Sequence, residues 1–192
     1  MNFHVRLFER IALPYSWFFA RQTRTYASCF EQGRYALPDP KGKRALDIGC
    51  GSGAFTQALK NEGWDTDGVD AAPAMVAQAG KLGVSCRYGN VLNGLPFPEK
   101  SYDLVSAAYV AHGLSAEERR LLFKETRRLS RSVVLFHDYN SVRRLTTDIA
   151  EYLEDGDYFN FIHTAVEEMN SAFSKVTIVP VGRQSAWYVC AP

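Results

Sequence analysis

A glycine-rich stretch in the first third of the chain constrains the fold more than any other feature. Residues 45–55 (ALDIGCGSGAF) indicate a short apolar strand, a tight turn and the first turn of a helix. Three glycines within residues 49–53 allow the backbone a positive φ and let a ligand approach it without a Cβ in the way. The helix that follows offers unpaired N–H groups and the positive end of its dipole. The stretch therefore predicts a site for a nucleotide-like ligand.

Composition narrows the classes of protein that can carry this turn. The chain has 192 residues, of which 46% are hydrophobic and 22% charged, and this balance is typical of one globular domain. Its net charge of +1 gives no reason to expect nucleic acid as a partner. The four cysteines contain no C-x-x-C pair, which argues against a disulfide framework or a metal site and fits a reducing, cytoplasmic location. No run of about 18 apolar residues is present, so we expect no membrane span.

The order of apolar segments predicts a doubly covered parallel sheet. From residue 43 onward, strand patterns alternate with helix patterns, and this alternation is typical of an α/β fold. The five expected parallel strands cover residues 43–48, 64–69, 84–88, 102–108 and 132–136. The end of the chain differs, because residues 175–181 and 185–191 are joined by a short loop and indicate an antiparallel hairpin.

The segments outside these strands divide the expected single domain, residues 1–192, into three parts. Residues 1–40 have helical spacing and form an N-terminal cap that Pro14 kinks or divides. Residues 43–138 form the core that binds the ligand, and residues 139–192 supply helices and the terminal hairpin on the acceptor side.

Capping boxes and charge patterns place the later helices. Ser115 with Glu118 begins a helix that ends near residue 129, and its arginines, Arg119 among them, are expected on a solvated face rather than on RNA. Apolar residues over 142–153 indicate a further helix. Residues 155–161 are expected to be irregular, and a second capping box at residues 164–167 is expected to begin the last helix.

Two carboxylates narrow the identity of the ligand. The glycine pattern alone fits a dinucleotide as well as another nucleoside. Asp47 lies two residues before the first glycine, where it would repel a pyrophosphate and suit an ammonium group. Asp70 ends the second strand, where a carboxylate can accept hydrogen bonds from both ribose hydroxyls. These features favour a nucleoside with a cationic tail over a diphosphate.

At this point the sequence resembles the class I S-adenosylmethionine-dependent methyltransferases, most of all the small-molecule branch that includes quinone-biosynthesis enzymes. The resemblance covers most of residues 8–138, and its motifs are residues 46–53, 68–70, 88–91 and 101–112. It implies a Rossmann-like three-layer α/β/α fold with a mostly parallel seven-stranded sheet. It also implies S-adenosylmethionine as cofactor, S-adenosylhomocysteine as product and a small molecule as methyl acceptor.

The resemblance assigns a cofactor site to the turns of this sheet. The residues that it would place against the cofactor are Asp47, Gly49, Cys50, Gly51, Gly53, Asp70, Ala71, Met75, Asn90, Val91 and Tyr109. Asn90 departs from the family, which usually has an acid there, although an amide oxygen can still accept a hydrogen bond from the adenine amine.

Candidate catalytic and acceptor-binding residues follow the fourth and fifth strands, at the edge where ligands bind in such sheets. The catalytic candidates are His112, His137 and Tyr139, and the substrate-binding candidates are Tyr15, Trp17, His112, Asp138 and Tyr158. A base is needed only if the acceptor must lose a proton. The departure of Ser16 from the acid usual in the family weakens the assignment of the N-terminal aromatics.

Two other functions remain open on the sequence. One is a nicotinamide-dependent oxidoreductase, against which Asp47 and the terminal hairpin speak. The other is a cofactor-binding domain without catalysis. The expected assembly is a monomer or a homodimer.

Overall fold

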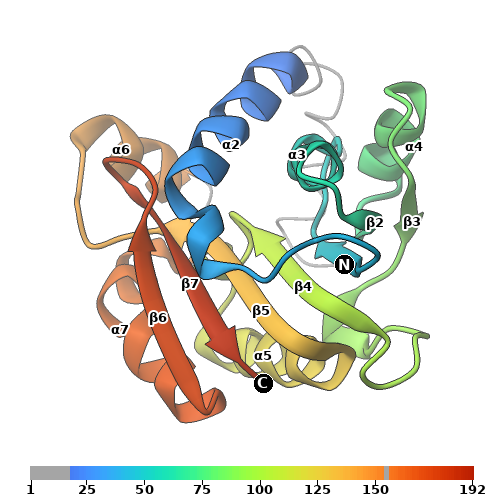
Figure 1. The fold of residues 1–192 in the computed structure, drawn as a ribbon. Coiled ribbons are helices and arrows are strands. Elements are labelled where there is room, and N and C mark those ends of the chain that lie inside the picture. Colours follow the sequence, from blue (N-terminus) through green and yellow to red (C-terminus); the bar gives the residue numbers. More distant parts are fainter. Residues whose placement is uncertain (1–17, 154–155) are drawn as a thin grey trace.

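The structure, a computed structural model, describes residues 18–153 and 156–192. These residues form one seven-stranded sheet in the order β3-β2-β1-β4-β5-β7-β6 (Figure 1). The strands are β1 (Arg44–Ile48), β2 (Asp65–Asp70), β3 (Cys86–Tyr88), β4 (Tyr102–Ala108), β5 (Ser130–Tyr139), β6 (Lys175–Pro180) and β7 (Ser185–Ala191). The first five are parallel, whereas β7 runs antiparallel to both β5 and β6. The predicted fold class and the terminal hairpin are confirmed.

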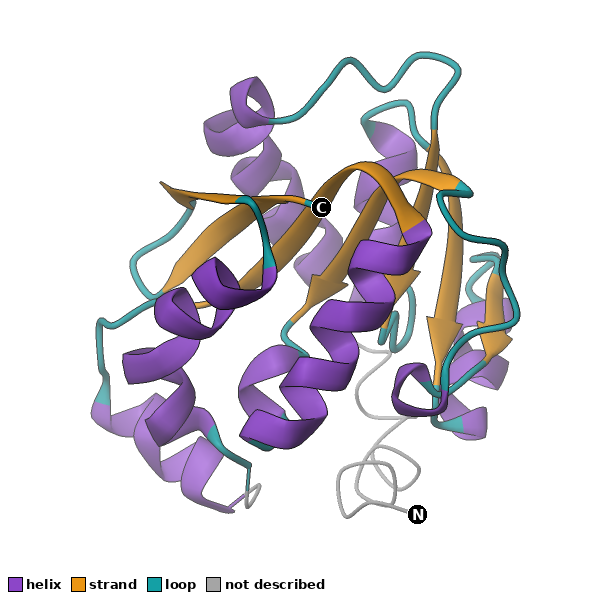
Figure 2. Cartoon of the chain, turned by 90° about the horizontal axis from the view of Figure 1, so that it is seen from below, coloured by secondary structure: helices purple, strands orange, loops and turns teal. Residues whose placement is uncertain are grey.

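Helices cover both faces of the sheet (Figures 1 and 2). The helices are α2 (Phe19–Gly33), α3 (Ala54–Asn61), α4 (Pro73–Lys81), α5 (Ala116–Leu129), α6 (Leu145–Leu153) and α7 (Tyr158–Ala172). Helices α2 and α3 pack against each other on one face, α5 and α7 pack on the other, and α4 packs against β2 and β3. Pro73 begins α4, where its missing N–H costs nothing. The kink predicted at Pro14 lies outside the described residues.

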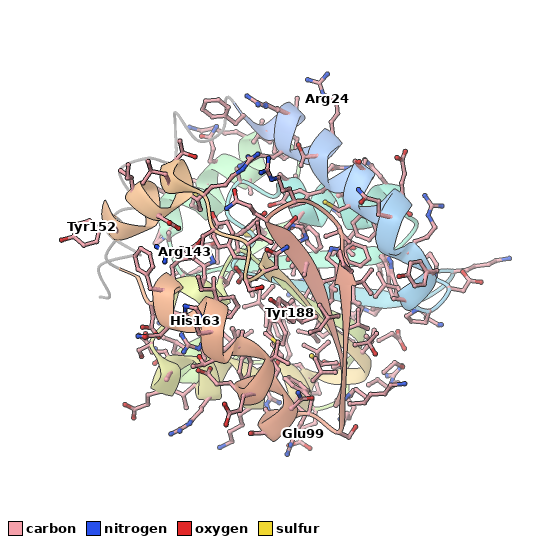
Figure 3. All side chains as sticks on the ribbon, turned by 90° about the vertical axis from the view of Figure 1, so that its left-hand side faces the viewer. Arg24, Glu99, Arg143, Tyr152, His163 and Tyr188 are labelled. Carbon is pink, nitrogen blue, oxygen red and sulfur yellow. A yellow bond between two sulfur atoms is a disulfide. The ribbon has the colours of Figure 1, made fainter. Side chains whose placement is uncertain are left out.

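Each central strand divides its side chains between two apolar cores. In β5, Val133 and Leu135 belong to the core under α2 and α3, whereas Val134 and Phe136 belong to the core under α5 and α7. Successive side chains of a strand point to opposite faces, so a strand covered on both sides is apolar throughout. On the outer surfaces of the helices, Arg24 of α2 and His163 of α7 point into solvent (Figure 3).

Helix α2 is fixed to the sheet by aromatic contacts. A Cβ on Gly33 would lie 2.6 Å from Cε3 of the Trp187 ring, so only glycine allows the helix to approach β7 so closely. Phe30 meets the same indole edge-on at a centroid distance of 4.9 Å. Tyr26 meets Phe55 of α3 edge-on at 5.0 Å. These contacts hold the side chains of α2 over the glycine turn.

The prediction for the segment before the last hairpin is wrong. Helix α7 begins at Tyr158, not near residue 164, and Tyr158, Phe161, Ile162, Ala165 and Met169 form its buried stripe. Apolar residues at this helical spacing outweigh the capping-box pattern at residues 164–167. The Thr164 hydroxyl instead donates to Glu168 Oε1 within the helix at 2.7 Å.

The solvated face predicted for α5 is also wrong at Arg119. Its side chain is 1% exposed and pairs with Asp157 at 2.7 Å and with Glu168 at 2.6 Å. A buried guanidinium needs such partners to offset its lost hydration. Arg119 thereby holds the beginning of α7 against α5.

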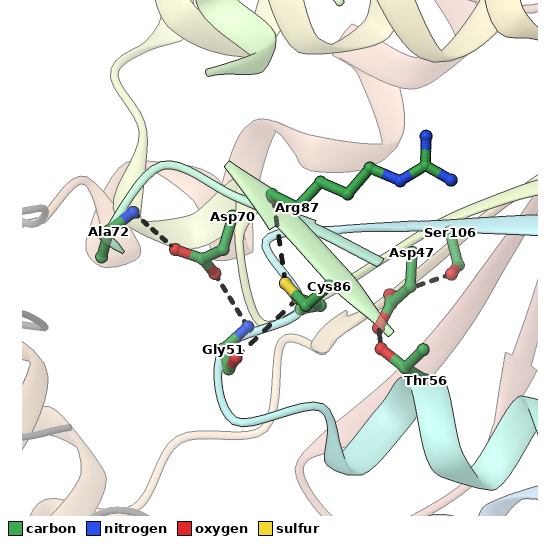
Figure 4. Close-up of a disulfide and its surroundings, with 9 residues drawn as sticks. Asp47, Gly51, Thr56, Asp70, Ala72, Cys86, Arg87 and Ser106 are labelled. Atoms are coloured by element: carbon green, nitrogen blue, oxygen red, sulfur yellow. Dashed lines mark hydrogen bonds between the residues drawn. A yellow bond between two sulfur atoms is a disulfide. The ribbon is translucent and has the colours of Figure 1, made fainter. Parts of the chain in front are cut away.

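The expectation of unpaired cysteines holds only for Cys29 and Cys190, because Cys50 and Cys86 form a disulfide. It joins the glycine turn to β3 (Figure 4). The two residues are 36 positions apart, and only the pairing of β2 with β3 brings them together. Sequence spacing carried no sign of it. Within the described parts of the chain, no helix has the length and apolar character that crossing a membrane requires.

Candidate functional site

A cavity of about 190 Å³ lies at the carboxyl ends of the parallel strands. Its walls come from the glycine turn after β1, the turn after β2, residues 89–92 after β3 and residues 108–114 after β4. Gln22 and Tyr26 of α2 complete it. Ligands of open α/β sheets bind at this edge, where strand order reverses. Here the reversal lies between β1 and β4.

The glycine turn has the backbone conformations that its sequence predicts. Gly49, Gly51 and Gly53 have φ values of 69°, 54° and 90°. A Cβ on Gly49 would lie 2.5 Å from Cγ2 of Val110, so a side chain there is excluded by sterics as well as by φ. Gly53 does not line the cavity. A Cβ added to it would lie 2.6 Å from Cγ1 of Val84.

Asp70 braces two turns with one carboxylate (Figure 4). Its Oδ2 accepts a hydrogen bond from the N–H of Gly51, and its Oδ1 accepts one from the N–H of Ala72, both at 2.8 Å. Asp70 also lines the cavity. The carboxylate therefore connects the β1 and β2 turns at the cavity wall.

Asp47 lies behind the glycine turn and does not line the cavity, in contrast to the prediction that it meets a cationic tail. It is fully buried, and its oxygens accept from the hydroxyls of Thr56 at 2.7 Å and Ser106 at 3.0 Å (Figure 4). Burial raises the pKa of the Asp47 carboxyl to about 7. Its hydrogen bonds join β1 to β4 and α3, which is a scaffold arrangement.

Most of the predicted cofactor residues meet at this one cavity. Those that line it are Gly49, Cys50, Gly51, Asp70, Ala71, Met75, Asn90, Val91 and Tyr109. Asn90 already uses its amide oxygen, which accepts from the N–H of Leu92 at 3.0 Å and caps the short helix Val91–Asn93.

His112 reaches the cavity from the short helix Ala111–Gly113, and Asp138 holds it in place. Nδ1 of His112 lies 2.7 Å from Oδ1 of Asp138. Asp138 is fully buried and also accepts from the N–H groups of Ala111, His112 and Tyr139. Asp138 accepts hydrogen bonds from its other partners, and accepting one from His112 as well places the imidazole hydrogen on Nδ1. Nε2 is then the nitrogen that can take up a proton.

Asp138 therefore differs from its predicted role in substrate binding. It does not line the cavity, because its oxygens are turned toward the turn after β4. It acts on the site through His112.

His137 is also placed differently from its prediction as a catalytic residue. Strand β5 continues to Tyr139, beyond the expected end at residue 136, so His137 lies within the strand. It is 1% exposed, and its Nδ1 accepts from Nε1 of Trp187 at 2.9 Å. Burial lowers the pKa of His137 to about 4, so its ring is neutral at physiological pH. It is part of the core and not of the cavity wall.

The remaining predicted aromatics lie behind the cavity wall or outside the described residues. The Tyr139 ring packs at 4.9 Å from that of His112 and at 5.0 Å from that of Tyr109. Tyr158 is fully buried, 5.0 Å from Tyr139, and does not line the cavity. Tyr15 and Trp17 lie outside the described residues.

Sequence reasoning missed several residues of the cavity, above all Gln22, Ser52, Tyr26 and Phe55. Tyr26 could have been found from the aromatic stripe of the N-terminal cap. Gln22 lies one helical turn before it, on the same face. Two polar atoms at the cavity, Gln22 Oε1 and Ser52 Oγ, are buried without a hydrogen-bond partner. Such orphaned atoms fit a ligand with polar groups at this end.

Comparison with known proteins finds similarity to methyltransferases. The family profile described as "Methyltransferase domain" matches residues 46–137, which include the glycine turn, Asp70, Asn90 and His112. This match agrees with the resemblance of the motifs to class I S-adenosylmethionine-dependent methyltransferases. Among the described residues of the chain, no group of three His, Cys, Asp or Glu side chains could hold a metal ion.

Curated relatives match part of the methyltransferase domain. A demethylmenaquinone methyltransferase of Tropheryma whipplei (strain Twist) is 34% identical over 80 residues, which make up 38% of this chain and 32% of the relative. The uncharacterised methyltransferase YcgJ of Bacillus subtilis is 35% identical over 78 residues, 38% of this chain and 31% of the relative. The match thus spans about a third of each relative's length.

Solved structures share the methyltransferase fold over almost the whole chain. A complex of DhpI with S-adenosylhomocysteine has a TM-score of 0.74 at 19% identity and covers 99% of this chain and 95% of DhpI. A Thermotoga maritima protein described as an S-adenosylmethionine-dependent methyltransferase, possibly a histamine N-methyltransferase, has a TM-score of 0.73 at 18% identity, with both chains covered completely. At these identities the likeness concerns the fold.

Proposed function

We propose that this protein transfers a methyl group from S-adenosylmethionine to a small-molecule acceptor and releases S-adenosylhomocysteine. The observation that carries the proposal is the single cavity that joins the glycine turn and Asp70 to a histidine backed by a buried carboxylate.

The cofactor supplies an electrophilic methyl group on a sulfonium. Asp70 and the backbone of residues 89–92 bind its adenosine, and Met75 packs against that end of the cavity. His112 orients the acceptor and takes up its proton at Nε2 if the acceptor must lose one, while Asp138 stabilises the resulting imidazolium. Holding the acceptor close to the methyl group in a dry cavity supplies the larger part of the rate enhancement.

The acceptor is proposed to be an uncharged molecule with a flat ring. Tyr26, Phe55 and Tyr109 supply aromatic surface to the cavity, and no described Lys or Arg side chain lines it. The name of the Tropheryma relative supports a demethylated quinol as the first acceptor to test. We further propose a cytoplasmic protein, as monomer or homodimer.

The test is calorimetry followed by turnover. The full chain is titrated with S-adenosylhomocysteine, S-adenosylmethionine and NAD, and then incubated with methyl-labelled cofactor and a panel of quinols, phenols and amines. Binding of the two adenosyl compounds but not NAD, with label transferred to one acceptor, is expected. Binding of NAD alone would refute the proposal, and binding without transfer to any acceptor would favour a domain without catalysis.

A further inference from the structure

A disulfide borders the cavity of this chain, although the proposed location of the protein is the reducing cytoplasm. Cys50 of the glycine turn lines the cavity, and its Sγ is bonded to Cys86 of β3 (Figure 4). The glutathione and thioredoxin systems of the cytoplasm keep thiols reduced, so a disulfide there is usually transient and either catalytic or redox-sensing. The pair is therefore a candidate for regulation of the site that it borders.

Strand β2, which lies between the two cysteines, leaves space for the bond. Gly68 of β2 is opposite Cys86 in the register of the sheet. A Cβ on Gly68 would lie 3.0 Å from Sγ of Cys50 and 3.1 Å from its Cβ. A larger residue at position 68 would crowd the Cys50 side chain, whereas glycine lets this side chain cross β2 and reach Cys86.

The bond connects two walls of the cavity. Cys50 belongs to the glycine turn, whereas Cys86 lies on β3, the strand that leads into residues 89–92 of the cavity wall. The N–H of Cys50 donates to the carbonyl of Val69 at 3.0 Å, which attaches the glycine turn to β2. The disulfide adds an attachment to β3. Its loss gives both walls more freedom, and a ligand must then order them at a cost in affinity.

The bonded pair differs from the other cysteines in access and in chemistry. Cys50 is 6% exposed, whereas Cys86 is only half-buried, so a reducing thiolate reaches the Cys86 sulfur. Cys29 and Cys190 are buried, and burial raises the pKa of their thiols to about 11 and about 12. These two stay protonated and do not exchange, because the thiolate is the reactive form.

We propose that Cys50 and Cys86 form a reversible redox switch of cofactor affinity, with the disulfide as the state of high affinity and the dithiol as the state of low affinity. This inference rests on the proposed function and gives its cofactor site a regulator of stated chemistry, a thiol–disulfide couple such as reduced and oxidised glutathione.

The chemical step is thiol–disulfide exchange. A glutathione thiolate attacks Sγ of Cys86, the bond between the two cysteines breaks, and Cys50 leaves as a thiolate that takes up a proton. A second glutathione thiolate attacks the mixed disulfide, which releases Cys86 as a thiol and forms oxidised glutathione. The two electrons and two protons that the pair gains come from the two glutathione thiols.

The experiment measures affinity for two ligands in each redox state. S-adenosylhomocysteine carries the amino-acid group, whereas 5′-methylthioadenosine has the same adenosine and thioether without it. Calorimetry is run on the full chain treated with oxidised glutathione, with excess reduced glutathione, and after reoxidation, and alkylation followed by mass spectrometry counts the free thiols. Reduction should weaken both ligands equally, by about threefold to tenfold, the cost of ordering about one side chain, and reoxidation should restore the affinity.

Two variants separate the switch from general effects of the reductant. Cys86→Ser cannot form the bond but leaves Cys50 at the cavity, so under either condition it should bind both ligands as the reduced protein does. Cys29→Ala removes a buried thiol outside the cavity and should keep the full response to glutathione. The reduced, unaltered protein supplies the same comparison if Cys86→Ser fails to fold, and circular dichroism follows folding in every sample.

The outcomes are distinct for the switch and for the function on which it rests. Equal affinities in the two redox states, a bond that excess reduced glutathione does not open, or loss of the folded spectrum on reduction overturns the switch alone. The same holds if every cysteine remains a free thiol after treatment with oxidised glutathione. An unaltered protein that binds neither ligand in either state overturns the proposed function and this inference together.

Discussion

The two ends of the cavity are built in different ways. At the glycine-turn end, the wall consists mainly of backbone and of one carboxylate, Asp70, that accepts two N–H groups. At the other end, side chains from the turn after β4 and from the end of β5 meet around His112. The wall at the glycine-turn end can be predicted from short stretches of sequence, because each turn supplies its own N–H groups.

The wall at the His112 end requires the whole fold. His112 and Asp138 are 26 residues apart and come together because β4 and β5 pair in parallel with Ala108 opposite His137. Tyr26 likewise reaches the cavity only because Trp187 and Gly33 fix α2 on the sheet. We infer that the glycine-turn end sets which cofactor binds, whereas the His112 end sets which acceptor is methylated.

The largest expected effect tests this division at His112. His112→Ala should lower kcat by about 10²- to 10⁴-fold, the usual contribution of a positioned general base, because Nε2 is lost. The Kd for S-adenosylhomocysteine should change less than threefold. Stopped assays with the best acceptor and calorimetry measure the two quantities separately.

His137 provides the matched control for His112. His137→Asn keeps a side-chain acceptor near Trp187 but loses ring packing, so it should lower the unfolding temperature and leave kcat within about threefold. A loss of kcat in His137→Asn that exceeds the loss in His112→Ala would contradict the division drawn above.

The disulfide should give the next largest effect, and it concerns the glycine-turn end alone. Cys86→Ser should lower the free energy of unfolding by about 2–4 kcal/mol under non-reducing conditions, because the bond closes a long loop in the unfolded chain. Denaturant unfolding measures this, and dithiothreitol should have the same effect on the unaltered protein. Thiol titration of the denatured, unreduced chain should detect Cys29 and Cys190 but neither of the bonded cysteines. Detection of all the cysteines would show that the bond is absent in solution.

The sequence predicts the strands, helices and backbone turns better than it predicts where individual side chains lie. The alternation of strands and helices indicated the parallel sheet, because buried strands are apolar throughout and helices repeat every 3.6 residues. The glycine turn and Asp70 were found in the same way, from residues with strict backbone roles. The terminal hairpin followed from its short loop.

The errors arise where a side chain's direction is decided by tertiary packing. Asp47 and His137 are adjacent to the correct turns, but pairing in the sheet turns Asp47 toward Thr56 and Ser106 and keeps His137 inside a longer β5. Propensity cannot show that β7 extends β5 by pairing Asp138 with Ala186. Arg119 was misplaced for the same reason, because its acidic partners lie on another segment.

The pH dependence of stability tests whether Asp47 belongs to the scaffold. Its pKa is raised to about 7 in the folded protein from 3.8, so the folded state binds the proton more tightly than the unfolded state. The stabilisation is therefore complete below the lower value and is lost as pH rises toward 7. Between pH 5 and 8 the unaltered protein should lose about 2–3 kcal/mol that Asp47→Asn does not lose. Chemical denaturation at several pH values measures the difference.

Affinity measurements on Asp47→Asn complete that test. A carboxyl that only joins β1 to β4 and α3 should leave the Kd for S-adenosylhomocysteine within about threefold. A much larger loss of affinity for this ligand, with no loss for 5′-methylthioadenosine, would return Asp47 to the role of partner for the ammonium group.

The smallest expected effect concerns Asp70 and tests whether this carboxylate binds the adenosine part of the cofactor. Asp70→Ala removes an acceptor for the N–H groups of Gly51 and Ala72 and the proposed partner of the ribose, so affinity should fall about tenfold to a hundredfold. The fall should be equal for S-adenosylhomocysteine and 5′-methylthioadenosine, because both carry the ribose. Asp65→Ala is the matched control, since that carboxylate lies on the same strand with its side chain 83% exposed and only a 4.0 Å contact to Arg44. If Asp70→Ala weakens S-adenosylhomocysteine but not 5′-methylthioadenosine, Asp70 contacts the amino-acid group and not the ribose. The adenosine would then lie elsewhere in the cavity.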